Sequence, residues 1–376
     1  MTMWVALVAF AVAAALAALA TPITQRLARR LGVLDIPSGH KAHGVPVPLL
    51  GGCAIFAAML LPAMLALAAA TVWADQGAAP AWLPAELEVH VPGAAAMAPM
   101  AMIILAGALA LHVLGLVDDC RDLGPWVKLV AEVAITTAVV LFCRRVRVLT
   151  VLGEPLSSIL TVVWLVAITN AFNFLDNMDG LSAGVAAICA AALLGTASSL
   201  EDQLFVCAGL GVLLGALAGF LPYNFHPARS FMGDAGSLVI GYLLAVLSCL
   251  TTYVAPGQTY YLYGIFVPLV LMAVPIYDTV SVILLRIRDR RNPMVGDRRH
   301  FSHRLVRRGM SVRKAVLTIY LCTGATAIAA SLLPRVDTIG AVLLFAQTVA
   351  ILLVVALLET GDGKPLTRRP GVKGKP

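Results

Sequence analysis

Three short segments of this sequence concentrate oxygen-bearing side chains within an otherwise apolar chain. One contains the adjacent pair Asp118 and Asp119, the second spans residues 168–184, and the third contains Gly233 and Asp234. Two adjacent carboxylates suit a divalent cation, or a pair in which one acid is ionised while the other is protonated and moves protons. The pattern therefore predicts one site that the three segments build together, with the rest of the chain as its scaffold.

The segment 168–184 is the richest of the three in polar groups and contains no Lys or Arg. Its carboxylates Asp176 and Asp179 are three residues apart, so a helical turn would place both on one face. Gly180 and Gly184 would leave room there for a ligand or for a neighbouring backbone. So many polar groups at a membrane edge are costly unless something cationic meets them. The segment also contains the amides Asn170, Asn173 and Asn177.

The segment 233–237 reads Gly-Asp-Ala-Gly-Ser and precedes an apolar run that predicts a helix. The free backbone N–H groups and the positive dipole end of that helix favour a phosphate, and Asp234 could hold a metal ion beside it. Phe231 lies next to the segment and is available to stack on a base. The alternative for Phe231 is simple packing at the membrane interface.

Two other segments supply positive charge. Lys41 stands with His40 and His43 in a loop held out of helix by Pro and Gly, where the three side chains could bind phosphate oxygens. A solvated basic loop is the alternative. Residues 286–314 contain eleven Lys and Arg, which predicts a polyanion site or a patch for lipid headgroups.

Two further positions are open to test. Lys128 and Glu132 are four residues apart at the start of a predicted helix, and this spacing favours a pair between them over contact with a substrate. Asp278 lies inside an apolar run after Pro275, and an acid within a membrane segment is a functional candidate by default.

The composition identifies an integral membrane protein. Of the 376 residues, 60% are hydrophobic and only 12% are charged, whereas soluble domains have about 25% charged residues. A span needs roughly 20 apolar residues and must be helical, because lipid cannot satisfy backbone polar groups. The sequence predicts an all-α polytopic fold, with one transmembrane domain over 1–360 and a disordered basic tail over 361–376. About eleven runs qualify: 3–20, 49–72, 98–117, 127–143, 158–173, 183–199, 204–222, 237–254, 261–284, 314–333 and 338–358.

The distribution of Lys and Arg predicts the orientation. If loops alternate between two sides, one side holds 23 of the 27 Lys and Arg. The positive-inside rule then places the N-terminus outside and the C-terminus in the cytoplasm. The cluster at 144–147 contradicts this assignment and raises the question of whether the fourth helix is misplaced. We expect 3–20 to be a retained helix and not a cleaved signal, because no basic residue precedes it.

All of these polar segments fall on the predicted cytoplasmic side. Acids on three loops and basic groups on two suit the joining of two phosphate-bearing partners, one soluble and one a membrane lipid. The competing class is a transporter with the acids as an ion path, but transporters place such groups near the midplane. A CDP-alcohol phosphotransferase would need a different acid spacing. The net charge of +7 is explained by topology and anionic lipid, and requires no nucleic acid.

The order and the residues of these segments resemble the motifs of the polyprenyl-phosphate N-acetylhexosamine-1-phosphate transferase family. The resemblance covers roughly residues 30–310 and implies ten or eleven helices, in agreement with the count of apolar runs. The matching segments are Asp35 to Pro37 with Lys41 to His43 and Gly51-Gly52, Gly115 to Asp119, Asn170 to Gly180, Asn224 with Phe231 to Ser237, Pro275 to Asp278, and Asp297 to Leu305.

The resemblance implies roles for the acidic residues. Asp234 would be the principal Mg²⁺ ligand, with Asn173 near it, and Mn²⁺ is an alternative ion. Asp118 would deprotonate the lipid phosphate so that it attacks the β-phosphate of a UDP-sugar, and Asp119 would help to position cation or substrate. Sequence cannot separate the roles of the two adjacent acids, since coupled acids titrate as a pair.

The resemblance also implies the substrate contacts. Asp176 and Asp179 would hold the uridine-sugar, and Phe231 would stack on uracil. His300 would contact the diphosphate, with His303 as a second catalytic residue of the same loop. The remaining substrate-binding positions that the motifs imply are Lys41, His43, Lys128, Asn224 and Arg304.

The chain departs from the family pattern at one place. The teichoic-acid and O-antigen branch usually has His-x-His-His-Arg-Leu, but here Ser302 replaces the middle histidine. The muramoyl-pentapeptide branch has three consecutive histidines, which are absent from this sequence. We therefore favour UDP-GlcNAc over UDP-MurNAc-pentapeptide as donor. The implied partners are a UDP-sugar, polyprenyl phosphate and membrane lipids, with a homodimer left open, at a bacterial inner membrane with a cytoplasmic active site.

Overall fold

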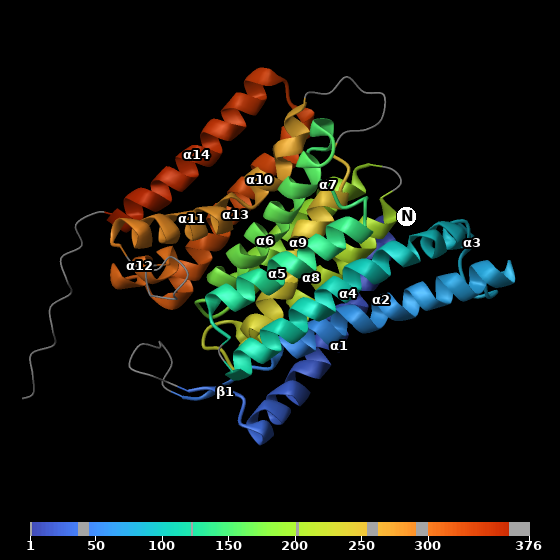
Figure 1. Ribbon diagram of the computed structural model, residues 1–376, viewed down its shortest axis with the longest axis horizontal. Coiled ribbons are helices and arrows are strands. Elements are labelled where there is room, and N and C mark those ends of the chain that lie inside the picture. The colour runs from blue at the N-terminus through green and yellow to red at the C-terminus, as the bar shows by residue number, and fades with distance from the viewer. Residues whose placement is uncertain are drawn as a thin grey trace, which may run out of the picture.

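The computed structural model describes residues 2–36, 45–121, 123–200, 203–253, 262–290 and 300–360. The described residues are mostly helical, and Figure 1 shows long helices packed side by side into one bundle. The long helices are α1 (Thr2–Leu31), α2 (Gly51–Gln76), α4 (Val91–Arg121), α5 (Pro125–Phe142), α6 (Leu156–Leu175), α7 (Leu181–Ser198), α8 (Leu204–Asn224), α9 (Gly233–Leu250), α11 (Ala273–Arg288), α13 (Val312–Leu332) and α14 (Thr338–Thr360).

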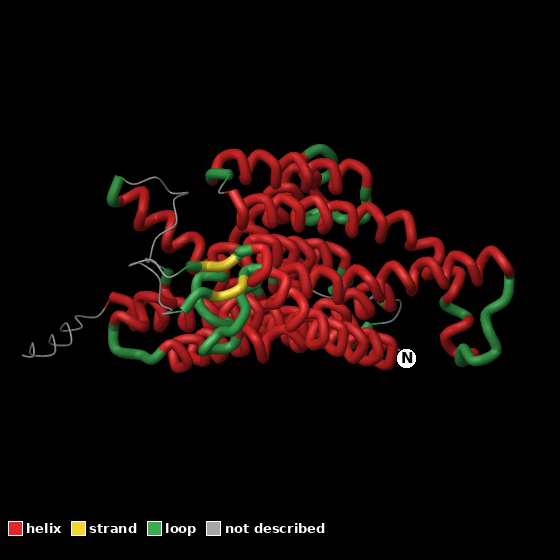
Figure 2. Tube along the Cα trace, turned by 90° about the horizontal axis from the view of Figure 1, so that it is seen from below, coloured by secondary structure: helices red, strands yellow, loops and turns green. Residues whose placement is uncertain are grey.

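Short elements complete the part of the chain that the structure describes. Strands β1 (Leu34–Asp35) and β2 (Val47–Pro48) pair antiparallel, with Leu34 opposite Pro48. In Figure 2 they are the yellow segments beside the loops. The short helices are α3 (Ala85–Glu88), α10 (Val267–Leu271) and α12 (Phe301–Arg307), and the 3₁₀ turns are Thr150–Leu152, Leu262–Phe266 and Leu333–Arg335.

The predicted all-α membrane fold is confirmed. Within the described residues, ten helices are long and apolar enough to cross a membrane, and a bent pair raises the count to eleven. The bent pair is the ninth predicted run, which we expected to be continuous. It breaks at Met272, where α10 and α11 meet at 64°. Pro275 explains the break, because its ring clashes with the carbonyl of Leu271, the last residue of α10.

The fourth predicted helix is in place, and the basic cluster after it has local partners. Arg147 donates through Nη1 to the carbonyl of Val140 near the end of α5, at 2.7 Å. The same side chain donates through Nε to Glu154 at 3.0 Å. A basic group at a helix C-terminus is favourable. Within the cluster at 144–147, Arg147 therefore completes the end of α5.

The polar segments meet at one end of the bundle. The end of α4, the start of α5, the end of α6 and the start of α9 lie together there. Figure 1 shows β1 and α12 at this end and the N-terminus at the opposite end. α9 is the most buried of the spanning helices, so the polar segments at its start are anchored to the centre of the bundle. Elsewhere in the bundle, α1 packs closely along α8.

Candidate functional site

The N-terminus of α9 is capped by a carboxylate from another helix. Asp119, on the last turn of α4, accepts hydrogen bonds from the backbone N–H groups of Asp234 at 2.8 Å and Ala235 at 3.2 Å. These groups have no partner within their own helix, and a negative charge is favourable at this end of it. Gly233 has φ +63°, and a Cβ there would lie 2.4 Å from the Asp119 carboxylate. Both carboxylate oxygens of Asp119 are therefore committed to fixing the start of α9.

Direct backbone contacts hold α9 against α2 and α4. A Cβ on Gly115 would lie 2.4 Å from the backbone nitrogen of Ala235, and one on Gly52 would lie 2.4 Å from that of Gly236. The N–H of Gly52 also donates to the carbonyl of Met232 at 3.0 Å. Main chain thus meets main chain on two sides of the turn that presents Asp234.

Asp118 faces a different environment from that of Asp119. One oxygen accepts from the backbone N–H of Leu123 at 2.8 Å, and the other lies 3.5 Å from the ammonium nitrogen of Lys128. The same ammonium group also contacts the carboxylate of Asp234. It lies 3.1 Å from the amide oxygen of Asn173, near the end of α6. Lys128 therefore sits among oxygens from three helices.

This cluster is partly open to solvent. The side chains of Lys128, Asp118 and Asp234 are 12%, 18% and 27% exposed. Asn173 is held in place because its amide nitrogen donates to Asp234 at 2.8 Å and to the hydroxyl of Ser237 at 2.9 Å. The cluster thus combines ordered polar groups with access for a ligand.

The donor set fits a hard divalent cation. Three oxygens, from Asp118, Asn173 and Asp234, already converge on one positive charge, the Lys128 ammonium. Carboxylate and amide oxygens are the ligands that Mg²⁺ accepts. Among the described residues, no group of three or more His, Cys, Asp or Glu could hold a metal ion. This donor set includes one amide oxygen, from Asn173.

The predicted pairing of Lys128 with Glu132 is wrong. Lys128 reaches the cluster described above, whereas Glu132 is fully buried and accepts a hydrogen bond from Asn170. This second pair of α5 and α6 residues lies one turn deeper in the bundle. The other carboxylate oxygen of Glu132 has no hydrogen-bond partner within the described chain.

The prediction of one helical face for Asp176 and Asp179 is also wrong. α6 ends at Leu175 and α7 begins after Gly180, so the two acids lie in a turn. Asp179 accepts hydrogen bonds from the ring of His226 at 2.7 Å and from the backbone N–H of Ala228 at 3.0 Å. It therefore ties this turn to the loop before α9.

Asp176 faces the acidic side of the site. Burial and the nearby carboxylates of Asp234 and Asp119 raise its pKa well above the usual value of an aspartate. Within the described chain, the Asp176 side chain has no hydrogen-bond donor against it. Asp176 therefore lies on the carboxylate-rich side of the site.

The side chain of Asn224 joins two backbone segments, the turn before α7 and the loop before α9. Its amide oxygen accepts from the N–H of Gly180 at 3.1 Å, and its amide nitrogen donates to the carbonyl of Ser230 at 3.0 Å. The side chain is buried. Gly184 makes room for the ring of Tyr320 from α13, rather than for a ligand. Phe231 is half-buried beside α9, and its backbone bonds the start of α2.

The segment 300–305 begins α12 and is fixed by its neighbours. Asp278, fully buried on α11, accepts from the ring nitrogen Nδ1 of His300 at 2.7 Å and from the N–H of Phe301 at 2.9 Å. Ser302 donates to the amide oxygen of Asn177 at 2.6 Å. The residue that departs from the family pattern thus joins α12 to the turn after α6.

Some predicted positions have other surroundings. Arg304 pairs with Glu359 of α14 at 2.9 Å and does not turn toward the cluster around Lys128. His303 lies on α12, one turn after His300. Lys41, His40 and His43 lie outside the described residues, as do Asp297 and the tail 361–376.

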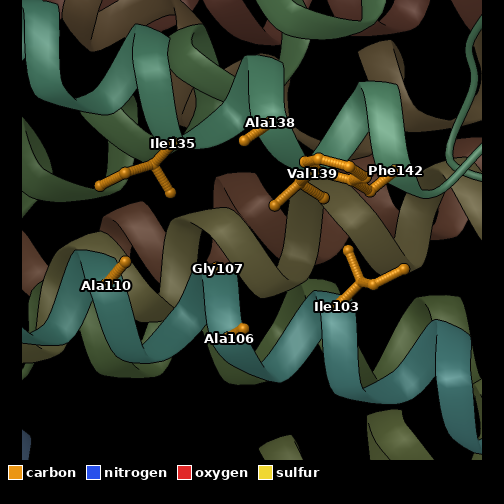
Figure 3. Close-up of a pocket in the computed structure, with 8 residues that line it drawn as sticks. All are labelled: Ile103, Ala106, Gly107, Ala110, Ile135, Ala138, Val139 and Phe142. Atoms are coloured by element: carbon orange, nitrogen blue, oxygen red, sulfur yellow. The ribbon is translucent and has the colours of Figure 1, made fainter.

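An apolar groove opens between α4 and α5, the helices that carry Asp118 and Lys128. It has a volume of about 290 Å³. Figure 3 shows apolar side chains on α4, among them Ile103 and Ala110, across the gap from Ile135, Val139 and Phe142 on α5. Its lining is almost wholly apolar. Its lining residues are Ile103, Ala106, Gly107, Ala110, Ile135, Ala138, Val139 and Phe142.

Comparison with known proteins identifies the family. A family model described as "Glycosyl transferase family 4" matches residues 101–252, which contain α5 to α9 and most of α4. A Mycolicibacterium smegmatis protein named "Decaprenyl-phosphate N-acetylglucosaminephosphotransferase" is 34% identical over 93% of this chain and 86% of its own length. The chain belongs to glycosyl transferase family 4.

Two further relatives match over similar lengths. A Bacillus subtilis protein named "Probable undecaprenyl-phosphate N-acetylglucosaminyl 1-phosphate transferase" is 33% identical over 84% of this chain and 81% of its own. An Escherichia coli protein named "Undecaprenyl-phosphate alpha-N-acetylglucosaminyl 1-phosphate transferase" is 26% identical over 81% and 77%. The resemblance found in the motifs is confirmed.

Substitution of Asp118 and Asp119, one at a time, should distinguish the roles of these two adjacent acids. Asp118→Asn keeps an acceptor for Leu123 and should lower kcat by about 10²- to 10⁴-fold with little change in thermal stability. Asp119→Asn replaces one acceptor oxygen with an amide nitrogen that faces a backbone N–H, so it should lose about 1–2 kcal/mol of helix capping. Thermal unfolding in detergent and initial rates would be measured on both variants. Equal thermal stability of the two would contradict this division.

Proposed function

We propose that this protein transfers N-acetylglucosamine 1-phosphate from UDP-GlcNAc to a polyprenyl phosphate, giving polyprenyl-diphosphate-GlcNAc and UMP. The observation that carries this proposal is the cluster in which Lys128 meets Asp118, Asn173 and Asp234 at one end of a membrane bundle. The relatives whose names state this activity supply the donor and acceptor classes.

The chemistry follows from the placement of the acids. An oxygen of the lipid phosphate attacks the β-phosphorus of the UDP-sugar, and the bond from that phosphorus to the UMP oxygen breaks. Asp118 would accept the proton of the lipid phosphate, because it is the adjacent acid whose oxygen faces the open cluster. Lys128 would stabilise negative charge that develops on the phosphoryl oxygens, and Asp119 would act only through the position of Asp234.

A divalent cation, Mg²⁺ or Mn²⁺, completes this proposal. Asp234 and Asn173 would hold it, with Asp118 beside them. It would supply neutralisation of the diphosphate and of the departing UMP. Asp234 interacts electrostatically with Asp118, Asp119 and Asp176, and Lys128 is the cation that the described residues place beside Asp118, Asp119 and Asp234. This excess of negative charge favours binding of a cation.

The finer assignments are also proposals. The site would face the cytoplasm of a bacterial inner membrane, with Asp176 and Asp179 toward the nucleotide sugar and Phe231 toward uracil. His300, oriented by Asp278, would contact the diphosphate through its second ring nitrogen. The alternative donor is UDP-MurNAc-pentapeptide. Against a transporter, the acids lie at one end of the bundle, and the described chain contains one broken helix pair rather than two.

An isotope exchange assay tests this function. Purified protein in detergent, with undecaprenyl phosphate, Mg²⁺ and radiolabelled UMP, should move label into UDP-GlcNAc. Removing the cation with EDTA should lower exchange at least 100-fold, and Mg²⁺ or Mn²⁺ should restore it. Label that enters only UDP-MurNAc-pentapeptide would move the protein to the other donor. Exchange with neither donor, or full exchange in EDTA, would contradict the proposal.

A further inference from the structure

α12 is a short helix that depends on its neighbours for its position. It has seven residues, Phe301–Arg307, and an isolated helix of that length is not stable in water. At its start, Asp278 of α11 holds His300, and Asn177 holds Ser302. These contacts fix one end of the segment that carries His300, which the proposed function places against the diphosphate.

The middle of α12 is fixed from α14. The guanidinium of Arg304 lies 2.9 Å from a carboxylate oxygen of Glu359, on the last turn of α14. The two side chains are 15% and 4% exposed. Arg304 also donates to the hydroxyl of Ser281 at 2.9 Å, and Tyr277 donates to Glu359 at 3.4 Å. One carboxylate therefore joins α12, α11 and α14.

α14 otherwise has the character of a lipid-facing helix. Figure 1 shows it at the edge of the bundle, with its last turn beside α11 and α12. Its large apolar side chains are mostly exposed, including Val342, Leu353 and Leu357. At its other end, Phe345 packs edge-on against Phe266. An acid at the end of such a helix is costly to bury unless it is paired, so its placement points to a specific role.

We propose that Glu359 is a positioning residue for transfer: it holds Arg304, and through Arg304 it holds the α12 segment that presents His300 and His303. The inference rests on the proposed function and deepens it. It reassigns Arg304, which the motif comparison places among substrate-binding residues. A guanidinium shared between Glu359 and Ser281 in a nearly dry environment acts through the placement of α12, not by direct contact with the diphosphate.

The pair makes a specific prediction for paired substitutions. Removing one partner leaves a buried charge unpaired, whereas replacing both with apolar side chains of similar volume does not. Glu359→Met and Arg304→Met should each lower kcat by about 10- to 100-fold, with the KM for UDP-GlcNAc nearly unchanged. The double variant should be no worse than either single one. Reversal of the charges, in Arg304→Glu with Glu359→Arg, should recover part of the lost activity.

The experiment is a double-substitution cycle on the full-length protein, read by initial rates and by thermal unfolding. Gln347→Leu, an exposed polar position on the same helix, is the matched control and should retain wild-type activity. Tyr277→Phe removes only the 3.4 Å hydrogen bond and should cost about twofold, which tests the network if the Met variants fold poorly.

The outcomes separate the two proposals. Inactive wild-type protein would refute the transferase function itself. Active wild-type protein with full activity in Glu359→Met and in Tyr277→Phe would overturn the positioning role. Strictly additive losses in the cycle, with Arg304→Met raising the KM for UDP-GlcNAc, would also overturn it, because Arg304 would then contact substrate directly.

Discussion

Asp234→Asn is expected to lower sugar-phosphate transfer by about a thousandfold. Asp234 contacts both Lys128 and Asn173 and lies at the capped start of α9, so it is the residue on which the whole cluster converges. The amide would keep the size of the side chain and remove its charge. Binding of a divalent cation and the alignment of Lys128 would then both be lost. The measurement is the UMP exchange rate at saturating Mg²⁺.

The matched control for Asp234→Asn lies at the opposite end of the bundle. Asp337 is a carboxylate whose oxygen accepts from the backbone N–H of Gly340 at 2.8 Å, at the start of α14. Asp337→Asn should leave exchange within about twofold of the wild type, because an exposed cap contributes mainly to stability. If Asp234→Asn kept more than a tenth of the wild-type rate, the assignment of the site to this cluster would fail.

Gly115→Ala is expected to lower exchange by at least 100-fold, although it adds one methyl group. The new Cβ would lie 2.4 Å from the Ala235 nitrogen and 2.4 Å from the Asp234 carbonyl carbon. Backbone atoms cannot rotate away, so α4 and α9 must separate and carry Asp118 away from Asp234. The thermal midpoint should also fall, since overpacking costs about 1–3 kcal/mol.

Gly324→Ala is the control for this substitution. Gly324 lies within α13, and a Cβ there would meet no atom within 4 Å. Alanine stabilises a helix by about 1 kcal/mol relative to glycine, so this variant should be as stable as the wild type or slightly more stable. Exchange should be unchanged. A wild-type rate of exchange in Gly115→Ala would contradict the prediction, because α4 and α9 could then separate without loss of activity.

The helices could be predicted from sequence because membrane spans follow from local composition. Every predicted run corresponds to a helix or, for 261–284, to a bent pair. The bend was missed although Pro268 and Pro275 stand within that run, and these two residues are the signal that could have found it. Gly180 is a similar signal for the turn that separates Asp176 from a helical face.

The site was predicted in part. Acids within an apolar chain are conspicuous, so Asp118, Asn173 and Asp234 were identified, and the structure brings them together. The distinct roles of Asp118 and Asp119 were not predictable, because capping of α9 from α4 is a contact between residues far apart in sequence. Glu359 was missed for the same reason: nothing near it in the sequence indicates that it meets Arg304.

The contacts among α2, α4 and α9 have a consequence for protein engineering. At Gly52, Gly115 and Gly236 the backbones of neighbouring helices are in direct contact. Any side chain added at these positions would therefore force the helices apart. In a mutant library made to change the donor sugar, variants at these positions would mostly be misfolded or inactive. Around Ser302 and the turn that contains Asn177, by contrast, a side-chain hydrogen bond sets the distance, so substitutions there can change it by degrees.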